Sequence, residues 1–163
     1  MAETEILSHW SHLIDGLEGQ SSDEFYTKLE AGITARKMPD VRCSRVSHFE
    51  GGMFSASRIY LRVTYKEHIF DVCAAPFGTG FFISWWLVNE PGCLTALSEI
   101  PILGWFIRLL YTRETYYRID VRLMFQSAVH AVVQEMVTEI CETSGKRVPA
   151  LLEFKPVMKE FFK

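Results

Sequence analysis

The most constraining feature of the sequence is the stretch 58–75, whose alternating side chains predict a β-hairpin with one register. Apolar and polar residues alternate through residues 58–66, the period of a strand with two unlike faces, and extended character resumes at residue 68. A turn at Lys66 and Glu67 makes one face wholly apolar, whereas a one-residue slip would turn those residues to solvent. The predicted apolar pairs are Val63 with Phe70, Leu61 with Val72 and Ile59 with Ala74.

The same register predicts a second, polar face on this hairpin. It sets Arg62 opposite Asp71, and an opposite-charge pair directly across two strands is favourable by about 0.2–1 kcal/mol. It also sets Tyr60 opposite Cys73. The two faces support the same pairing, so the register is predicted twice.

A further strand over residues 81–88 extends the polar face and gives it aromatic side chains. Gly78-Thr79-Gly80 reads as a turn and not as a phosphate loop, because a strand and not a helix follows it. Arginines beside aromatic rings form cation–π contacts and are enriched at recognition surfaces. The predicted binding surface consists of Arg58, Tyr60, Arg62, Asp71, Phe82 and Trp86. In the alternative interpretation a helix covers this face, and Arg62 and Asp71 are a structural pair.

The predicted fold class is α+β, in a single domain over residues 1–163. The sheet is an antiparallel meander of about four strands, roughly 41–48, 56–66, 68–75 and 80–89. Two helices precede it, one over Ile6 to Leu17 and one from Ser22 to Pro39. C-terminal helices follow, including a long one near 120–142 that begins at Asp120, with a short edge strand over 115–119 before it and a final helix over 149–162.

Composition and charge exclude several classes of function. A net charge of −3 makes nucleic acid an unlikely partner, because such proteins neutralise phosphates with basic side chains. The N-terminus lacks the basic start and apolar run of a signal peptide, which predicts a cytoplasmic chain with reduced cysteines. Residues 92–111 are long enough to cross a membrane, but the charges of Glu99 and Arg108 within them argue against a span. Peripheral membrane contact through Trp105 and Arg108 is a variant of the binding hypothesis.

Metal and cofactor sites are not predicted. Cys43 and His48 are five residues apart, as are His68 and Cys73, and an odd separation on a strand puts the two side chains on opposite faces. His130, with glutamine four residues to either side, is predicted to be exposed on the polar side of the long helix.

Cys93 is the best candidate for a catalytic nucleophile. It follows Pro91 and Gly92 and precedes a predicted helix, whose N-terminus lowers the pKa of a thiol. The order of helix, four-stranded meander, cysteine and further helices resembles that of ubiquitin-conjugating enzymes, although the chain lacks their usual His-Pro-Asn tripeptide and Cys93 follows the strand sooner. This resemblance implies a cysteine-dependent transferase.

Two functions are therefore predicted. The first is a soluble, non-enzymatic module that binds a protein partner or an apolar ligand, with the surface above as its site. The second is the transferase with Cys93 as nucleophile.

Overall fold

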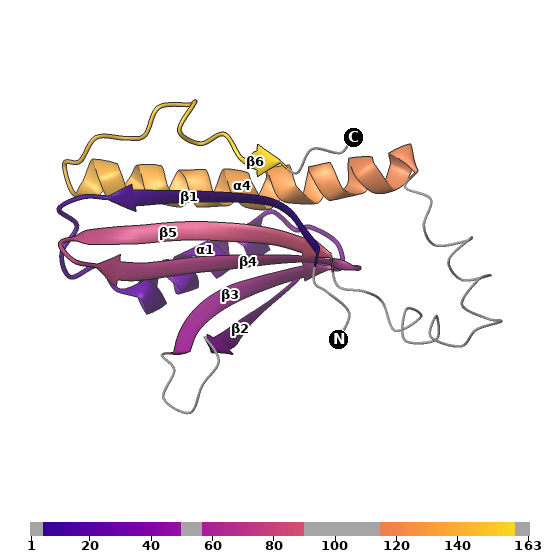
Figure 1. Cartoon of the computed structure of the whole chain (residues 1–163), viewed down its shortest axis with the longest axis horizontal. Helices are drawn as coiled ribbons and strands as arrows, with labels where there is room; N and C mark the ends of the chain where they lie inside the picture. The colour runs from indigo at the N-terminus through magenta and orange to yellow at the C-terminus, as the bar shows by residue number, and fades with distance from the viewer. Residues whose placement is uncertain (1–4, 50–56, 90–114, 159–163) are drawn as a thin grey trace.

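A six-stranded antiparallel sheet with two helices on one face makes up the part of the chain that the computed structural model describes, residues 5–49, 57–89 and 115–158 (Figure 1). The elements in chain order are β1 (Glu5–Ile14), α1 (Ser22–Ala35), β2 (Arg42–Phe49), β3 (Ser57–Tyr65), β4 (His68–Phe77), β5 (Gly80–Asn89), α4 (Tyr116–Thr143) and β6 (Val157–Met158). Across the sheet the strands run in the order β2-β3-β4-β5-β1-β6. The predicted α+β class with an antiparallel sheet and a long C-terminal helix is confirmed.

Two tight turns fix the register of the central strands. Lys66, at φ 53°, turns the chain between β3 and β4, so that Val63 pairs with Phe70 and Arg62 with Asp71 as predicted. Gly78, at φ 60°, begins the turn between β4 and β5, where glycine adopts the left-handed conformation without steric cost. Both predicted turns are confirmed.

The ladder between β3 and β4 stops at Leu61, and a tyrosine hydroxyl occupies the place of the next pair. Tyr26 of α1 donates to the carbonyl of Ile59 at 2.7 Å and accepts from the N–H of Ala74 at 2.8 Å. Ile59 was predicted to face the core opposite Ala74, but its side chain is 54% exposed. The hydroxyl therefore satisfies backbone groups that direct pairing of the two strands would otherwise satisfy.

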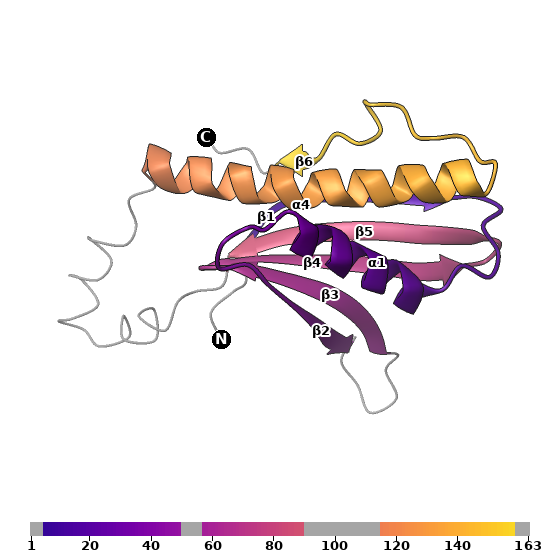
Figure 2. The same ribbon diagram turned by 180° about the vertical axis from the view of Figure 1, so that it is seen from behind.

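The core lies between the sheet and the two helices, which cover the same face (Figure 2). Its largest wholly buried side chains include Trp85, Phe70 and Phe81 from the strands and Phe25 and Tyr26 from α1. The helices approach closely at Gly32, where an added Cβ would lie 2.7 Å from Cγ1 of Val132 on α4.

The segment predicted as the first helix is strand β1, which pairs with β5 and β6. Trp10 and Ile14 are four residues apart, a spacing that places both on one face of either a helix or a strand. A bulge between Ile6 and Ser8 changes the alternation, so that Leu7 is buried on the core side as well. The helical spacing therefore comes from a bulged strand, and the sheet has six strands where about four were predicted.

Two predictions near the C-terminus are also wrong. The long helix begins after Thr115, whose hydroxyl accepts from the N–H of Arg118, so residues 115–119 form no edge strand and Asp120 is not the N-cap. The predicted final helix is instead a series of turns that ends in the short strand β6, beside β1. Pro149 and Pro156 leave too few residues between them for a stable helix.

Candidate functional site: the open face of the sheet

The face of the sheet that points away from α1 and α4, here the open face, carries no helix within residues 5–49, 57–89 and 115–158. Cross-strand partners share a face, so the register assigns residues to it. Arg62 pairs with Asp71, Asp71 with Trp86, and Trp86 with His9. The helix of the alternative interpretation is therefore not found among the described elements.

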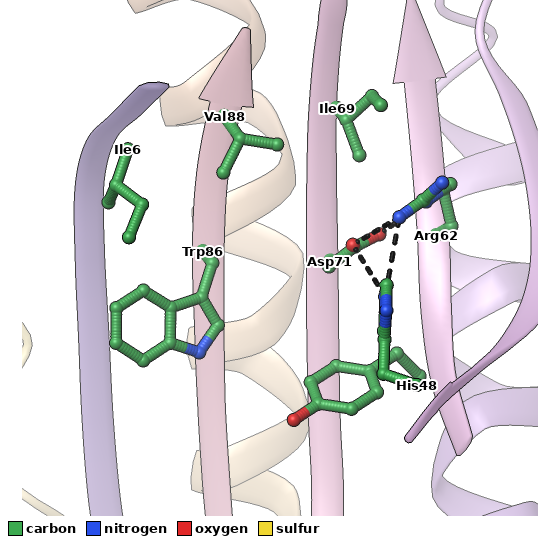
Figure 3. A pocket seen from close by; sticks show the side chains of 8 residues that line it. Ile6, His48, Arg62, Ile69, Asp71, Trp86 and Val88 are labelled. Atoms are coloured by element: carbon green, nitrogen blue, oxygen red, sulfur yellow. Dashed lines mark hydrogen bonds and ion pairs between the residues drawn. The ribbon is translucent and has the colours of Figure 1, made fainter. Parts of the chain in front are cut away.

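A pocket of about 400 Å³ lies on the open face and crosses the strands (Figure 3). Four of its lining residues belong to the predicted binding surface: Tyr60, Arg62, Asp71 and Trp86. The other four are Ile6, His48, Ile69 and Val88. Five of the six strands contribute a side chain, so the pocket depends on the pairing of β1 to β5.

The remaining predicted site residues lie outside this pocket. Arg58 and Phe82 are on the open face by their pairing with His48 and Leu13, but they do not line the pocket. Cys93, Trp105 and Arg108 lie outside the described residues. The proposed nucleophile and the proposed membrane contact thus stay predictions.

Arg62, Asp71 and His48 form a charged cluster at one end of the pocket. Arg62 donates two hydrogen bonds to the carboxylate of Asp71, from Nε to Oδ1 at 2.8 Å and from Nη2 to Oδ2 at 2.7 Å. Nε2 of His48 lies 3.3 Å from Oδ2 of Asp71 and 3.3 Å from Nη2 of Arg62. The two-point geometry fixes the plane of the guanidinium as well as its position.

Exposure divides this cluster into an inner and an outer part. The side chain of Asp71 is only 10% exposed, whereas that of His48 is 50% exposed. The carboxylate is therefore a fixed internal charge, neutralised by Arg62, and the imidazole is the group that a ligand can reach. Figure 3 shows the ring of His48 beside this pair.

Two aromatic side chains border the pocket. His9 stacks on Trp86 with ring centroids 5.0 Å apart and an interplanar angle of 18°. Tyr60 meets the ring of His48 edge to face, also at 5.0 Å. Packing of this kind restricts the indole and the phenol, so the aromatic surface is largely preformed.

Sequence reasoning missed half of the pocket for identifiable reasons. The helical spacing of residues 6–17 predicts a helix there and hides the place of Ile6 on the sheet beside Val88. The sequence around His48 raises only the question of metal binding, whereas the pairing of β2 with β3 places this residue opposite Arg58 on the open face. Residues 42–48 show no regular alternation of apolar and polar side chains, so only the register with β3 gives this placement.

His130 was predicted to be exposed but is 8% exposed, inside a hydrogen-bonded network. Its Nδ1 accepts from the indole Nε1 of Trp85 at 3.0 Å, and its Nε2 donates to the carbonyl of Phe154 at 2.8 Å. Burial lowers the pKa of His130, as it does for His68, whose Nδ1 donates to Oδ1 of Asn89. The prediction failed because the polar stripe of α4 packs against the sheet and the C-terminal segment.

The described cysteines are free thiols with no sign of activation. Burial raises the pKa of Cys43, Cys73 and Cys141, which disfavours the thiolate needed for nucleophilic attack. None of these three thiols is therefore a candidate nucleophile.

Two structural findings and the comparisons with known proteins also bear on function. Within the described residues, no group of three or more His, Cys, Asp or Glu side chains is placed to hold a metal ion. None of the helices in the described part of the chain is long and apolar enough to cross a membrane. No protein-family model, curated protein or solved structure matches the chain.

Proposed function

We propose that this protein is a non-enzymatic binding module and that the open face of its sheet recognises a partner protein. The observation that carries the proposal is the pocket itself, in which the partly exposed indole of Trp86 lies beside the preformed cluster of Arg62, Asp71 and His48. Aromatic and arginine side chains around a hollow are the composition of protein-recognition surfaces.

The two faces of the sheet differ in composition, and this difference supports the proposal. The helices bury one face of the sheet in a large core that includes Trp85 and Phe70, whereas the open face has mixed polar and apolar side chains. Trp86 lines the pocket on the open face and is not part of the core cluster.

The transferase alternative depends on Cys93. The order of helix and four-stranded meander behind the resemblance to ubiquitin-conjugating enzymes is present as α1 and β2 to β5, but β1 precedes α1 and extends the sheet beyond β5. Cys93 lies outside the described residues, so its role stays a prediction.

The proposal is tested with Trp86→Ala and His48→Ala, which remove exposed parts of the pocket. Arg62→Ala is unsuitable, because it would leave the nearly buried carboxylate of Asp71 without its counter-charge. The wild-type protein is crosslinked in an extract of its natural source, and a captured partner is then purified and titrated against each variant. The matched control is Leu151→Ala, a truncation of an exposed apolar side chain on the C-terminal segment.

We expect crosslinks on the open face and a loss of affinity of at least about tenfold in Trp86→Ala, with none in Leu151→Ala. Circular dichroism should show that all variants keep the wild-type fold. Crosslinks confined to other surfaces, or equal affinities of Trp86→Ala and Leu151→Ala for the partner, would reject the open face as the recognition surface.

A further inference from the structure

The open face changes from apolar to cationic along its cross-strand rows. One row of directly paired residues runs Ile6, Val88, Ile69, Thr64, Arg42, from β1 to β2. The neighbouring row runs His9, Trp86, Asp71, Arg62, Ser44. Figure 3 shows the same division, with Ile6, Val88 and Trp86 on one side of the pocket and Arg62 and His48 on the other. The pocket therefore has an apolar end on β1 and β5 and a basic end on β3 and β2.

Ion pairing sets two arginines of this face apart from others in the described chain. Arg36, Arg45, Arg62, Arg118 and Arg147 each pair with a carboxylate. Arg42 and Arg58 are exposed, and within the described residues no carboxylate forms an ion pair with either. Both lie on the open face, opposite Thr64 and His48 respectively.

Negative charge is scarce on the same face. Asp71 is the only acidic residue that the register of the described strands places there, and Arg62 neutralises it. The chain as a whole carries a net charge of −3. The basic end, which here includes Arg42 and Arg58 on β2 and β3 beside the pocket lining, is therefore a local positive field on an acidic protein.

We infer that the open face recognises an extended acidic segment of its partner protein, an inference that rests on the proposed function. An apolar side chain of the segment enters the pocket against Trp86 and Val88, and a carboxylate reaches Arg42 on β2, which lies in the same cross-strand row as Val88. Strands β5 and β2 are three strand spacings apart, or about 14 Å, which an extended chain covers in about four residues. The recognised pattern is an apolar residue followed, about four residues on, by Asp or Glu.

Charge complementarity favours a short segment over a polyanionic surface. A nucleic acid or an anionic membrane presents many negative charges to the whole chain, whose net charge of −3 opposes the approach. A short segment meets only the local field of the basic end, where Arg42 and Arg58 lack acidic partners among the described residues. The hollow beside Trp86 also requires a discrete apolar side chain, which a polyanionic surface does not supply.

The inference is tested with capped, fluorescein-labelled peptides and the full-length protein. One peptide carries a leucine and, about four residues further on, two glutamates; matched peptides replace the glutamates with glutamine or lysine. Fluorescence polarisation is measured at low and high salt for the wild type, Arg42→Glu, Trp86→Ala and Lys155→Glu. Lys155 is an exposed residue of the C-terminal segment, so its substitution makes the same change in net charge away from the site.

We expect the acidic peptide to bind at least about tenfold more tightly than the glutamine peptide, with an affinity that falls as salt rises. Arg42→Glu should remove this preference and Lys155→Glu should keep it, while Trp86→Ala should weaken both peptides. Equal binding of the acidic and glutamine peptides, with loss in Trp86→Ala, would overturn the acidic preference and leave the proposed function standing. Preference for the lysine peptide, no binding of any peptide, or Arg42-dependent flotation with phosphatidylserine vesicles in place of peptide binding would also overturn it.

Discussion

The indole of Trp85 donates a hydrogen bond of 3.0 Å to Nδ1 of His130, deep between the sheet and α4. The bond requires an unprotonated Nδ1, because the same atom cannot both accept from Trp85 and carry a proton. Nε2 carries the ring's proton and donates a hydrogen bond to the carbonyl of Phe154. The fold therefore selects one neutral tautomer of this histidine, which links α4 to β5 and to the C-terminal segment.

The first prediction is that the protein loses stability in mild acid. Burial lowers the folded-state pKa of His130 and His68, so below about pH 6.5 the unfolded chain binds more protons than the folded one. The free energy of unfolding should be fully retained above that pH and fall as the pH decreases below it. The slope contributed by each histidine is at most about 1.4 kcal/mol per pH unit.

Urea unfolding between pH 8 and pH 5 measures this slope, and His130→Gln should reduce it. A side-chain NMR titration of His130 provides an independent measurement. A midpoint at or above the ordinary histidine value of about 6.5 would contradict the prediction.

The second prediction concerns the hydroxyl of Tyr26, whose pKa burial raises to about 12. Tyr26→Phe should lower the free energy of unfolding by about 1–3 kcal/mol, because it leaves backbone groups of Ile59 and Ala74 without their partner. Tyr65→Phe is the matched control, since no hydrogen bond of its hydroxyl is found among the described residues. Equal stability of the two variants in urea would show that water or strand movement replaces the lost bonds.

The third prediction is that the effect of Gly32→Ala on the free energy of unfolding changes sign with the size of residue 132. In the wild type the added Cβ meets Cγ1 of Val132 at 2.7 Å, and valine is stiff about χ1, so overpacking should outweigh the gain in helix propensity of about 1 kcal/mol. In a Val132→Ala background the same substitution should stabilise. Thermal and urea unfolding of the four proteins measures the coupling, and additive effects would exclude direct contact.

The fourth prediction concerns the structural role of Arg62. Arg62→Ala should destabilise by about 1–3 kcal/mol, because the carboxylate of Asp71 is only 10% exposed and loses its bidentate partner. Adding Asp71→Ala should restore part of that loss. A double variant no more stable than Arg62→Ala would show that the stranded carboxylate is not the cause.

The sequence predicted the parts of the fold that local pairing determines. The hairpin of β3 and β4 was predicted because its alternation and its turn at Lys66 lie within one short stretch, and the pair Arg62–Asp71 followed from it. Strand β1 was missed because the spacing of Trp10 and Ile14 fits both a helix and a strand. The residues that pair with them on β5, Trp85 and Phe81, are also distant in sequence.

The same distinction divides the candidate site. Tyr60, Arg62, Asp71 and Trp86 were grouped correctly on one face because they lie on three consecutive strands joined by tight turns. Ile6 reaches the pocket only through the non-local pairing of β1 with β5, which no nearby turn specifies. Residues that close a site from distant strands leave little trace in local periodicity.

The position of β1 also orders the assembly of the sheet during synthesis. Among the described strands β1 is synthesised first, yet one of its edges pairs with β5 and the other with β6, close to the end of the described chain. The hairpins of β2 to β5 need only neighbouring residues, whereas β1 has no strand to pair with until β5 has been made. The apolar end of the pocket, where Ile6 pairs with Val88, therefore needs β5, whereas the basic end needs only the earlier strands β2 to β4.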